Sequence, residues 1–574
     1  MAEYLSPGIY VEEFDSGPSP MQGVGTSVAG FVGLAEKGPV SGAPILVTSP
    51  SDFSRKFGGY LQSNEFGEYR FLAHAVNHFF NNGGSKLFIV RVAPADAKSA
   101  SYTSVDKKKS ILIEAKNPGV WGNSISLYFE PTFENKSQIM KDLDGTGKYK
   151  LKNAFGFDKG DIVCIQGLKD IQFSKIINTH QNTITLPEAF KGKVVDTGLL
   201  PKVVIKTCEM NVVIECDNIV EKYENVSFNI DSPRHLEKVL SKSELVNIKV
   251  VDPSEVVAPF DYLKEIFNMP KSENIKISLS NGSNGSVKKL SDADFIGKDN
   301  GPGERTGIQS FLDNSNINIL AVPGITSANV QLSLVSQCEN LGSRFAILDI
   351  PLKAKSVLEV SSRRDLIDSD YCALYHPWLR VYDPLDKRDI YIPPSGSIAG
   401  IYARSDNTHG VHKAPANEIV NSCTGLSVNY NSAEQDFLNP KGINAIRSFP
   451  GAGIRVWGAR TASSKPLWKY VNIRRLFIYI EESIKANTSW VVFEPNDARL
   501  WSRVRMTIET FLGGIWSSGA LVGGSPDEAF FVDIGNNTMT KDDIDNGRLI
   551  CIIGVAPVKP AEFVIFRITQ KTAE

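Results

Sequence analysis

The two ends of the chain constrain its fold more than any other part of the sequence. Near the start, Ile9–Phe14 (IYVEEF) is rich in β-forming residues and lies between a Pro-Gly pair and the linker Ser16–Pro20 (SGPSP). Near the end, Glu562–Thr569 (EFVIFRIT) follows two prolines. Each segment therefore has the composition of a strand, but no adjacent segment with which it would form a hairpin.

The residues alone leave two interpretations of the N-terminal segment open. It is a frayed terminus or an edge strand of its own domain, or it is an arm that adds a strand to a neighbouring molecule. An arm of this kind makes little demand on sequence, because backbone amides and carbonyls pair whatever the side chains are.

Between the ends, strand and helix patterns alternate. Ser27–Leu34 and Lys86–Val92 are typical of buried strands, and Phe71–Phe80 (FLAHAVNHFF) has helical spacing. The alternation resumes with Ile317–Val322, a helical stretch and Phe345–Asp349. This pattern predicts an α/β core in which helices cover a sheet.

The stretch from about 125 to 310 differs from the rest. Asn117–Asn123 (NPGVWGN) marks its beginning, and Asp161–Gln166 and Thr183–Leu186 are predicted to be short strands separated by turns. We therefore expect residues 125–310 to be β-rich material inserted on the outside of the core.

Two amphipathic helices are predicted in the C-terminal third, at Leu467–Lys485 and Arg499–Leu512. Basic residues gather on both of them, among them Arg474, Arg475 and Arg503. A solvated helix face and a contact surface for an acidic partner are both compatible with this pattern.

The composition argues against several classes of protein. The 62 basic and 64 acidic residues give a net charge of -2, which provides no electrostatic attraction to nucleic acid or to an anionic membrane. The seven cysteines are scattered and form no CxxC pair, as expected for reduced thiols in a cytosolic protein. The start does not resemble a signal peptide, and no run of ~18 apolar residues occurs. We expect a protein made in a cytoplasm, without membrane insertion.

No pattern predicts a catalytic, cofactor-binding or metal-binding residue. Neither the phosphate-binding GxxxxGK[ST] motif nor the GxSxG motif occurs. His74 and His78 have zincin spacing, but Ala75 replaces the general-base glutamate. His409 and His412 resemble part of a subtilisin site, but the serine motif is missing. The chain is therefore predicted not to be an enzyme and to need no cofactor.

Seven segments form a distinctive series that covers both ends of the chain. They are PGIYVEE (Pro7–Glu13), HFFNNGGSKLFIVRV (His78–Val92), NPGVWGN (Asn117–Asn123), HPWLRVYDP (His376–Pro384), Ile392–Asn417, Leu438–Ser463 and Trp468–Ile484. Together and in this order they resemble the tail sheath proteins of contractile phages, contractile injection systems and tailocins. Residues 125–310 match none of these motifs and fit the variable outer domains of that family.

The resemblance implies a structural subunit that forms stacked hexameric rings around an inner tube. The sheath would contract from a metastable extended state and drive the tube through a target envelope. Its partners would be itself, the inner tube protein, and baseplate and terminal cap proteins, with an AAA+ ATPase as a further candidate and no nucleic acid. Assembly would occur in the bacterial cytoplasm, and the product would be part of a phage tail or an injection particle. The alternatives are a baseplate or other structural component of the same machine, or a subtilisin-like hydrolase.

The resemblance also implies two sets of site residues. The terminal segments would pair with strands of neighbouring copies through Gly8, Ile9, Tyr10, Val11, Glu12, Glu13, Phe14, Glu562, Phe563, Val564, Ile565, Phe566, Arg567, Ile568 and Thr569. The candidates for contact with the inner tube are Lys469, Arg474, Arg499 and Arg503.

The expected fold class is α/β, with a discontinuous mixed core sheet flanked by helices, an inserted β-rich outer part and two terminal β-arms. The expected division is 1–20 for the N-terminal arm and linker, 21–124 for the first part of the core, 125–310 for the inserted outer part, 311–420 for a central core with a non-catalytic subtilisin-like fold, 421–556 for a C-terminal domain facing the tube, and 557–574 for the C-terminal arm.

Overall fold

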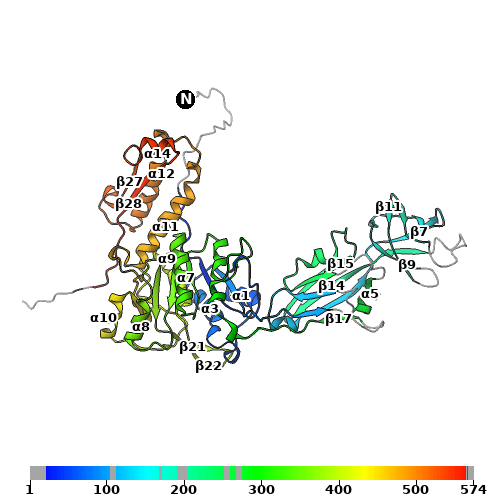
Figure 1. Ribbon diagram of the computed structural model, residues 1–574, viewed down its shortest axis with the longest axis horizontal. Helices are drawn as coiled ribbons and strands as arrows, with labels where there is room; N and C mark the ends of the chain where they lie inside the picture. Colours follow the sequence, from blue (N-terminus) through cyan, green and yellow to red (C-terminus); the bar gives the residue numbers. More distant parts are fainter. Residues whose placement is uncertain are drawn as a thin grey trace, which may run out of the picture.

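The computed structural model describes residues 21–103, 111–166, 171–189, 203–250, 259–266, 274–563 and 565. A central α/β body carries an upright C-terminal module at one side and an elongated β-rich extension at the other (Figure 1). The predicted N-terminal arm, Gly8–Phe14, lies outside the described residues, as do Val564 and Phe566–Thr569 of the C-terminal segment.

A nine-stranded mixed sheet forms the centre of the body. In spatial order its strands are β2 (Ile45–Val47), β3 (Leu87–Val92), β1 (Ala29–Leu34), β18 (Ile319–Ala321), β19 (Phe345–Asp349), β20 (Cys372–His376), β25 (Ile443–Phe449), β26 (Gly453–Val456) and β23 (Glu418–Ile419). Strands β3 to β25 are parallel, and the others are antiparallel. Because β1 pairs with β18, the sheet joins two parts of the chain that the whole extension separates in sequence. The predicted α/β core is confirmed.

Helices cover both faces of this sheet, which explains why every residue of β1, β19 and β20 is buried. The helices of the body are α1 (Pro50–Phe57), α2 (Ser63–Phe66), α3 (Leu72–Asn81), α6 (Asp292–Ile296), α7 (Ala328–Leu341), α8 (Val357–Arg364), α9 (Ser395–His409) and α10 (Ser432–Leu438). A second, three-stranded sheet contains β21 (Leu379–Asp383), β22 (Arg388–Ile392) and β24 (Gly425–Leu426).

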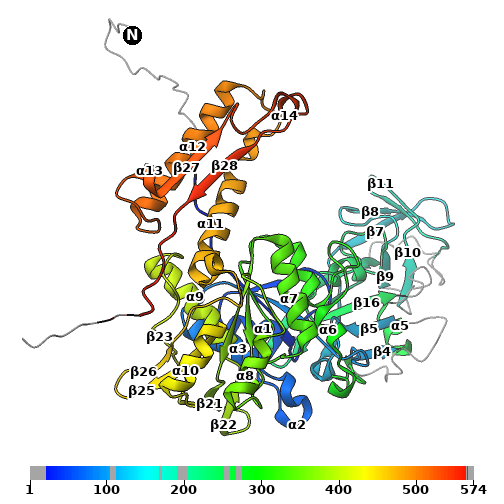
Figure 2. The ribbon, with the colours of Figure 1, turned by 60° about the vertical axis from the view of Figure 1, so that its left-hand side comes forward.

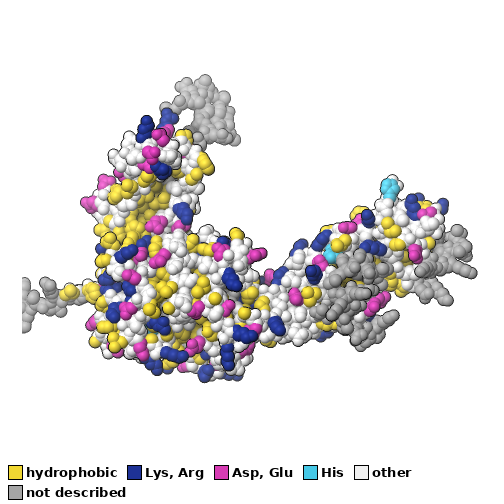
Figure 3. All heavy atoms as spheres, in the orientation of Figure 1, with side chains coloured by type: hydrophobic (Ala, Val, Ile, Leu, Met, Phe, Trp, Pro, Cys, Tyr) yellow, Lys and Arg dark blue, Asp and Glu magenta, His cyan; other side chains and the backbone are white. Residues whose placement is uncertain are grey.

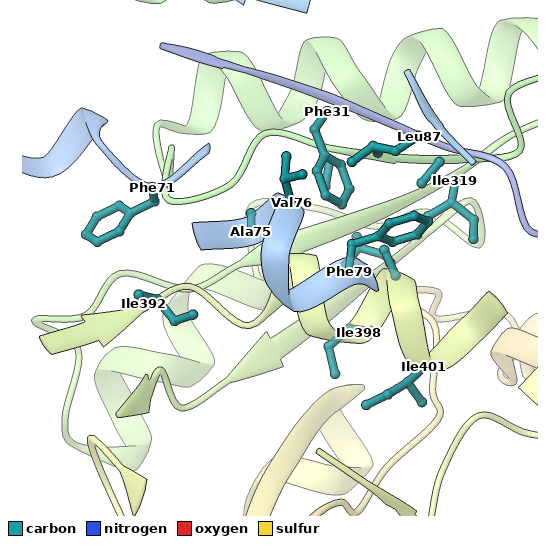
Figure 4. Packing of buried hydrophobic residues seen from close by; sticks show 14 of the residues in the cluster. Phe31, Phe71, Ala75, Val76, Phe79, Leu87, Ile319, Ile392, Ile398 and Ile401 are labelled. Carbon is teal, nitrogen blue, oxygen red and sulfur yellow. The ribbon is translucent and has the colours of Figure 1, made fainter. Parts of the chain in front are cut away.

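Helix α9 lies directly against α3 on one face of the sheet. A Cβ atom at Gly396 would lie 2.5 Å from the carbonyl oxygen of Ala75, and one at Gly400 would lie 2.3 Å from that of Phe79. The two glycines therefore permit a close approach of the helix backbones. Phe79 in turn contacts Phe31 of β1 edge to face, with ring centroids 5.8 Å apart (Figure 4).

The extension consists of antiparallel sheets (Figure 1). Nearest the body are a four-stranded sheet of β15 (Ile219–Val226), β14 (Glu209–Cys216), β6 (Ser126–Thr132) and β17 (Ile275–Ser278), and a three-stranded sheet of β16 (Val246–Val250), β5 (Ile111–Ala115) and β4 (Ser101–Thr103), with α4 (Leu236–Leu240) and α5 (Pro259–Ile266). The distal sheet contains β10 (Gln172–Lys175), β9 (Ile162–Gln166), β13 (Val204–Thr207), β7 (Lys136–Asp142), β8 (Lys148–Leu151), β12 (Thr183–Thr185) and β11 (Asn178–His180).

The chain returns to the body before residue 310. Phe295 of α6 and Ile308 are buried in one hydrophobic cluster with Val32 of β1 and Leu320 of β18. The segment that contains α6 therefore packs on the central sheet. The division into domains, with its boundary at 310, stays a prediction.

The C-terminal module contains two long helices and a two-stranded sheet. Its elements are α11 (Val471–Asn487), α12 (Ala498–Ser517), α13 (Pro526–Ala529), β27 (Phe530–Ile534), α14 (Lys541–Asp545) and β28 (Cys551–Val555). The two helices predicted from hydrophobic spacing are confirmed as α11 and α12. Among the described residues, no helix combines the length and the apolar composition required to cross a membrane.

Candidate functional site

Helix α12 supports the C-terminal module through a continuous apolar stripe. Its Leu500, Val504, Ile508 and Leu512 are all buried in one cluster with residues of α11 and β27. The helix begins at a side-chain cap, because Asp497 accepts hydrogen bonds from the amides of residues 499 and 500, both at 2.9 Å.

The sheet β27–β28 packs one face on α12 and exposes the other. Val532, opposite Ile553, is buried against the helix, whereas Phe531 is 57% exposed and Ile552 is 50% exposed. Hydrophobic side chains are gathered on this part of the module (Figure 3). Exposed apolar side chains grouped on one face favour contact with a partner, so this exposed face is a candidate contact surface.

Both outer edges of this sheet are open within the part of the chain that the structure describes, where each strand has one strand partner. The amide of Ala556 donates to the carbonyl of Ala529 at 2.9 Å. Because the direction of the amides alternates along a strand, those of Cys551, Ile553 and Val555 point away from β27. One additional strand could therefore pair along each edge.

Residues Met21–Ser27, which we call the strap, run along α11 before the chain enters β1. The amide of Val24 donates to the Ser483 hydroxyl at 3.1 Å, and the side-chain amide of Asn487 donates to the carbonyl of Gln22 at 2.9 Å. A Cβ atom at Gly23 would lie 1.9 Å from the Tyr479 hydroxyl oxygen, so the strap contacts the helix closely. The chain that follows the predicted N-terminal arm is thus bound to the module.

A buried ion pair fixes the module and the strap to the body. Arg475 of α11 donates to both carboxylate oxygens of Asp406 on α9, at 2.8 and 2.6 Å, and also to the carbonyl of Thr26 at 2.9 Å. Thr26 donates its hydroxyl hydrogen to Asp406 at 2.6 Å. Burial opposes the charge of Arg475, but the adjacent carboxylate outweighs it, and the pKa of Arg475 is raised. The sequence predicted a charged helix face here and not a buried pair.

The first residue of the predicted C-terminal strand, Glu562, is held by its own chain. Arg460 donates its Nε hydrogen to Glu562 at 2.7 Å, Tyr470 donates its hydroxyl hydrogen at 3.1 Å, and the Lys469 ammonium lies 3.6 Å away. Partial burial by itself raises the pKa of Glu562. The hydrogen bond with Arg460 and the nearby positive charges lower this pKa by more, so the net shift is downward. Phe563 beyond it is 75% exposed.

The four residues predicted to contact a tube lie in different surroundings. Arg474 is buried, pairs with Asp370 and lies over the rings of Trp468 and Tyr371, and Lys469 pairs with Glu562. Arg499 and Arg503 are both exposed on the first half of α12, and Arg503 lies 3.9 Å from Glu494 of its own chain. Of the four predicted residues, these two are the ones that the rest of the described chain leaves exposed.

The histidine pair on α3, His74 and His78, is part of the packing. His74 is buried 3.6 Å from Asp383, and burial lowers its pKa to about 4. His78 lies 3.1 Å from the Ser397 hydroxyl, and burial likewise lowers its pKa to about 4. No group of three or more His, Cys, Asp or Glu side chains in the described ranges is placed to hold a metal ion.

Two protein-family models match the C-terminal half. Residues 305–462 match the phage tail sheath protein central domain, and residues 463–571 match the phage tail sheath C-terminal domain. Residues 305–571 belong to the phage tail sheath family. The predicted membership is confirmed, and tail sheath proteins are structural proteins and not enzymes.

Individual sheath proteins are similar over part of the chain. The tail sheath protein of Burkholderia phage BcepMu is 28% identical over 307 residues, which cover 50% of this chain and 63% of that protein. The tail sheath protein of Salmonella phage ViI is 25% identical over 278 residues, which cover 44% and 43%. The chain thus spans less than two thirds of the length of either relative.

One solved structure has the same fold as this chain. It is the sheath complex of an extracellular contractile injection system, PVC, in the contracted state. It has 21% sequence identity and a TM-score of 0.52, and the alignment covers 100% of this chain and 99% of that chain.

Proposed function

We propose that this protein is the repeating subunit of a contractile sheath, in which the terminal segments of each copy complete the β27–β28 sheet of other copies. The observation that carries the proposal is the match between two strand-forming termini and two open strand edges in one module. Membership of the sheath family supports it. Stacked hexameric rings around an inner tube are the arrangement that this exchange would hold together.

Strand exchange suits a long polymer because many weak links act together. Each added strand forms a few ladder hydrogen bonds, which contribute ~1 kcal/mol each. It also covers apolar side chains such as Phe531 and Ile552. One such link is marginal, but every copy in a lattice makes several, and multivalency turns them into a continuous mesh.

Contraction in this proposal uses stored conformational energy. The linkers Ser16–Pro20 and 557–560 both contain prolines. During contraction they would change direction while the exchanged strands stay paired. The rigid bodies then rotate and slide from a metastable extended lattice into a more stable one. The tube protein, baseplate and terminal cap proteins and an AAA+ ATPase are the further proposed partners, and the machine is a phage tail or an injection particle.

Electron microscopy of the purified protein tests this proposal. Wild-type protein is expected to form hollow tubes. Ile553→Pro is expected to impair their formation, because it removes an outward-facing amide and blocks an added strand while leaving the hydrogen bonds with β27 intact. The loss of one hydrogen bond, together with the steric clash between the proline ring and the added strand, should raise the critical concentration for polymerisation by about tenfold or more.

Ile553→Ala is the matched control, because it shortens the same partly buried side chain but keeps the amide. It should still form tubes. Equal polymerisation of the proline and alanine variants would contradict strand addition at β28, and monomers with peptidase activity would favour the hydrolase instead.

We further propose that Arg499 and Arg503 contact the inner tube through charge complementarity. Reversal of both, Arg499→Glu with Arg503→Glu, is expected to reduce assembly on purified tubes by about tenfold at low salt. Arg505→Glu on the same helix is the control, because the Arg505 guanidinium points to β27 of its own chain, where it donates to the Ile534 carbonyl at 3.0 Å and lies 3.7 Å from Asp533. Unchanged co-sedimentation of the double variant with tubes would remove these residues from the contact.

A further inference from the structure

A groove of about 970 Å³ lies at the base of the C-terminal module. Its walls are the end of α9 with the loop after it, the helix α10, the segment after β26, and Val558–Phe563, which continues directly from β28. In Figure 2 this last segment runs down from β28 along the body. The groove therefore begins just beyond the C-terminal end of β28.

The groove carries positive charge that its own residues do not neutralise. Arg447 and Lys559 line it, and neither forms an ion pair within the described ranges. Arg447 donates to the Gln435 side-chain oxygen at 2.8 Å, but its Nε hydrogen is buried without a hydrogen-bond partner there. Asp436 is the one lining carboxylate that lacks a basic partner. An unpaired buried donor in a basic groove favours an acidic occupant.

The other basic lining residues are already paired. Lys413 pairs with Glu418, and Arg460 pairs with Glu562. The groove also has an aromatic wall, because Trp457 is 38% exposed and lies 4.5 Å from Phe449, ring centroid to ring centroid. The occupant that fits combines carboxylates with an apolar ring.

The chain itself contains a segment of this chemistry. Residues 1–20 include Glu3, Glu12, Glu13 and Asp15, and they contain no lysine or arginine. Three of these carboxylates surround Phe14 in the sequence Glu12–Asp15 (EEFD). We propose that the groove binds the EEFD segment of another copy, an inference that rests on the strand exchange proposed above.

The reach of the chain favours another copy as the donor. If Gly8–Val11 pairs along β28, the next four residues continue for ~13 Å into the groove. The chain's own arm is tied at Gln22, beside Asn487 at the far end of α11, whereas Tyr470 at the near end lines the groove. The 17-residue helix between them is ~26 Å long. Residues 15–22 span about 26–29 Å only when fully extended, so the chain's own arm would reach the mouth of the groove only as a straight segment.

A charge-exchange experiment on the full-length chain tests the inference. Arg447→Glu with Lys559→Glu is expected to raise the critical concentration for polymerisation about tenfold, and Glu12→Lys with Glu13→Lys should do the same. The chain with all four substitutions should polymerise within about threefold of wild type, because the charges are again complementary. Lys289→Glu with Lys353→Glu, at exposed sites away from the groove, is the control with the same charge change.

The outcomes separate this inference from strand exchange itself. If the groove reversals leave polymerisation unchanged while removal of residues 1–20 abolishes it, the groove assignment is overturned and strand exchange stands. If the reversals block polymerisation but the arm reversals do not restore it, the groove takes a different partner and the assignment fails. If removal of residues 1–20 has no effect on polymerisation, strand exchange through the N-terminal arm is contradicted, and the groove assignment, which rests on it, is contradicted as well.

Discussion

Removing residues 1–20 is expected to abolish polymerisation and leave a folded monomer. The deletion takes away the whole predicted arm but keeps the strap, whose hydrogen bonds to Ser483 and Asn487 hold the new N-terminus on α11. Each copy would lose one of the strands that link it to the others, and a lattice held by multivalent weak links does not survive the loss of one class of link. Sedimentation and electron microscopy would show no tubes at any accessible concentration, with an unchanged circular dichroism spectrum.

A shorter deletion, of residues 1–6, is the control for this experiment. It keeps Gly8–Phe14 and the linker, so tubes should still form. Intact tubes from the chain that lacks residues 1–20 would contradict strand exchange through the N-terminal arm.

Arg475→Met is expected to lower the free energy of unfolding by ~3–5 kcal/mol, because it leaves the buried Asp406 carboxylate without its partner. The Arg475 and Asp406 side chains are only 5% and 4% exposed, so water cannot replace the lost hydrogen bonds. Urea unfolding of monomeric protein below its critical concentration would measure the change. Hydrogen exchange should also show faster exchange in the strap, because Arg475 binds the Thr26 carbonyl.

The control is Arg505→Met, which removes an arginine from an exposed pair with Asp533 on the same module. This substitution should lower the free energy of unfolding by less than ~1 kcal/mol. Adding Asp406→Leu to Arg475→Met should recover part of the lost stability, because no buried charge is then left alone. If Arg475→Met and Arg505→Met lower the free energy of unfolding by similar amounts, the buried pair does not hold the C-terminal module on the body.

Much of the body could be predicted because its elements have strong local signals. The strands β1, β3 and β19 are short apolar runs, and the stripe from Leu500 to Leu512 has helical spacing. The buried state of Arg475 could not be predicted in this way. Helical periodicity treats arginine as a surface residue, and its partner Asp406 is 69 residues away in sequence.

The strands β27 and β28 were also missed. A long connection that contains α14 separates them, so no short turn signalled a hairpin. Their alternating apolar residues, Phe530–Ile534 and Cys551–Val555, were the available signal. The arms, the domain boundaries and the tube contacts stay predictions, because they depend on other copies or on residues outside the described ranges.

The first and last segments of the described chain, the strap and Glu562, are both held beside helix α11. The strap is bound along α11, and Glu562 is bound by Arg460 and Tyr470 next to the start of that helix. A pull on either terminus is therefore passed to the other through the C-terminal module, without crossing the β-rich extension. The extension is a side branch of this path, so a force applied between the two termini would not pass through it.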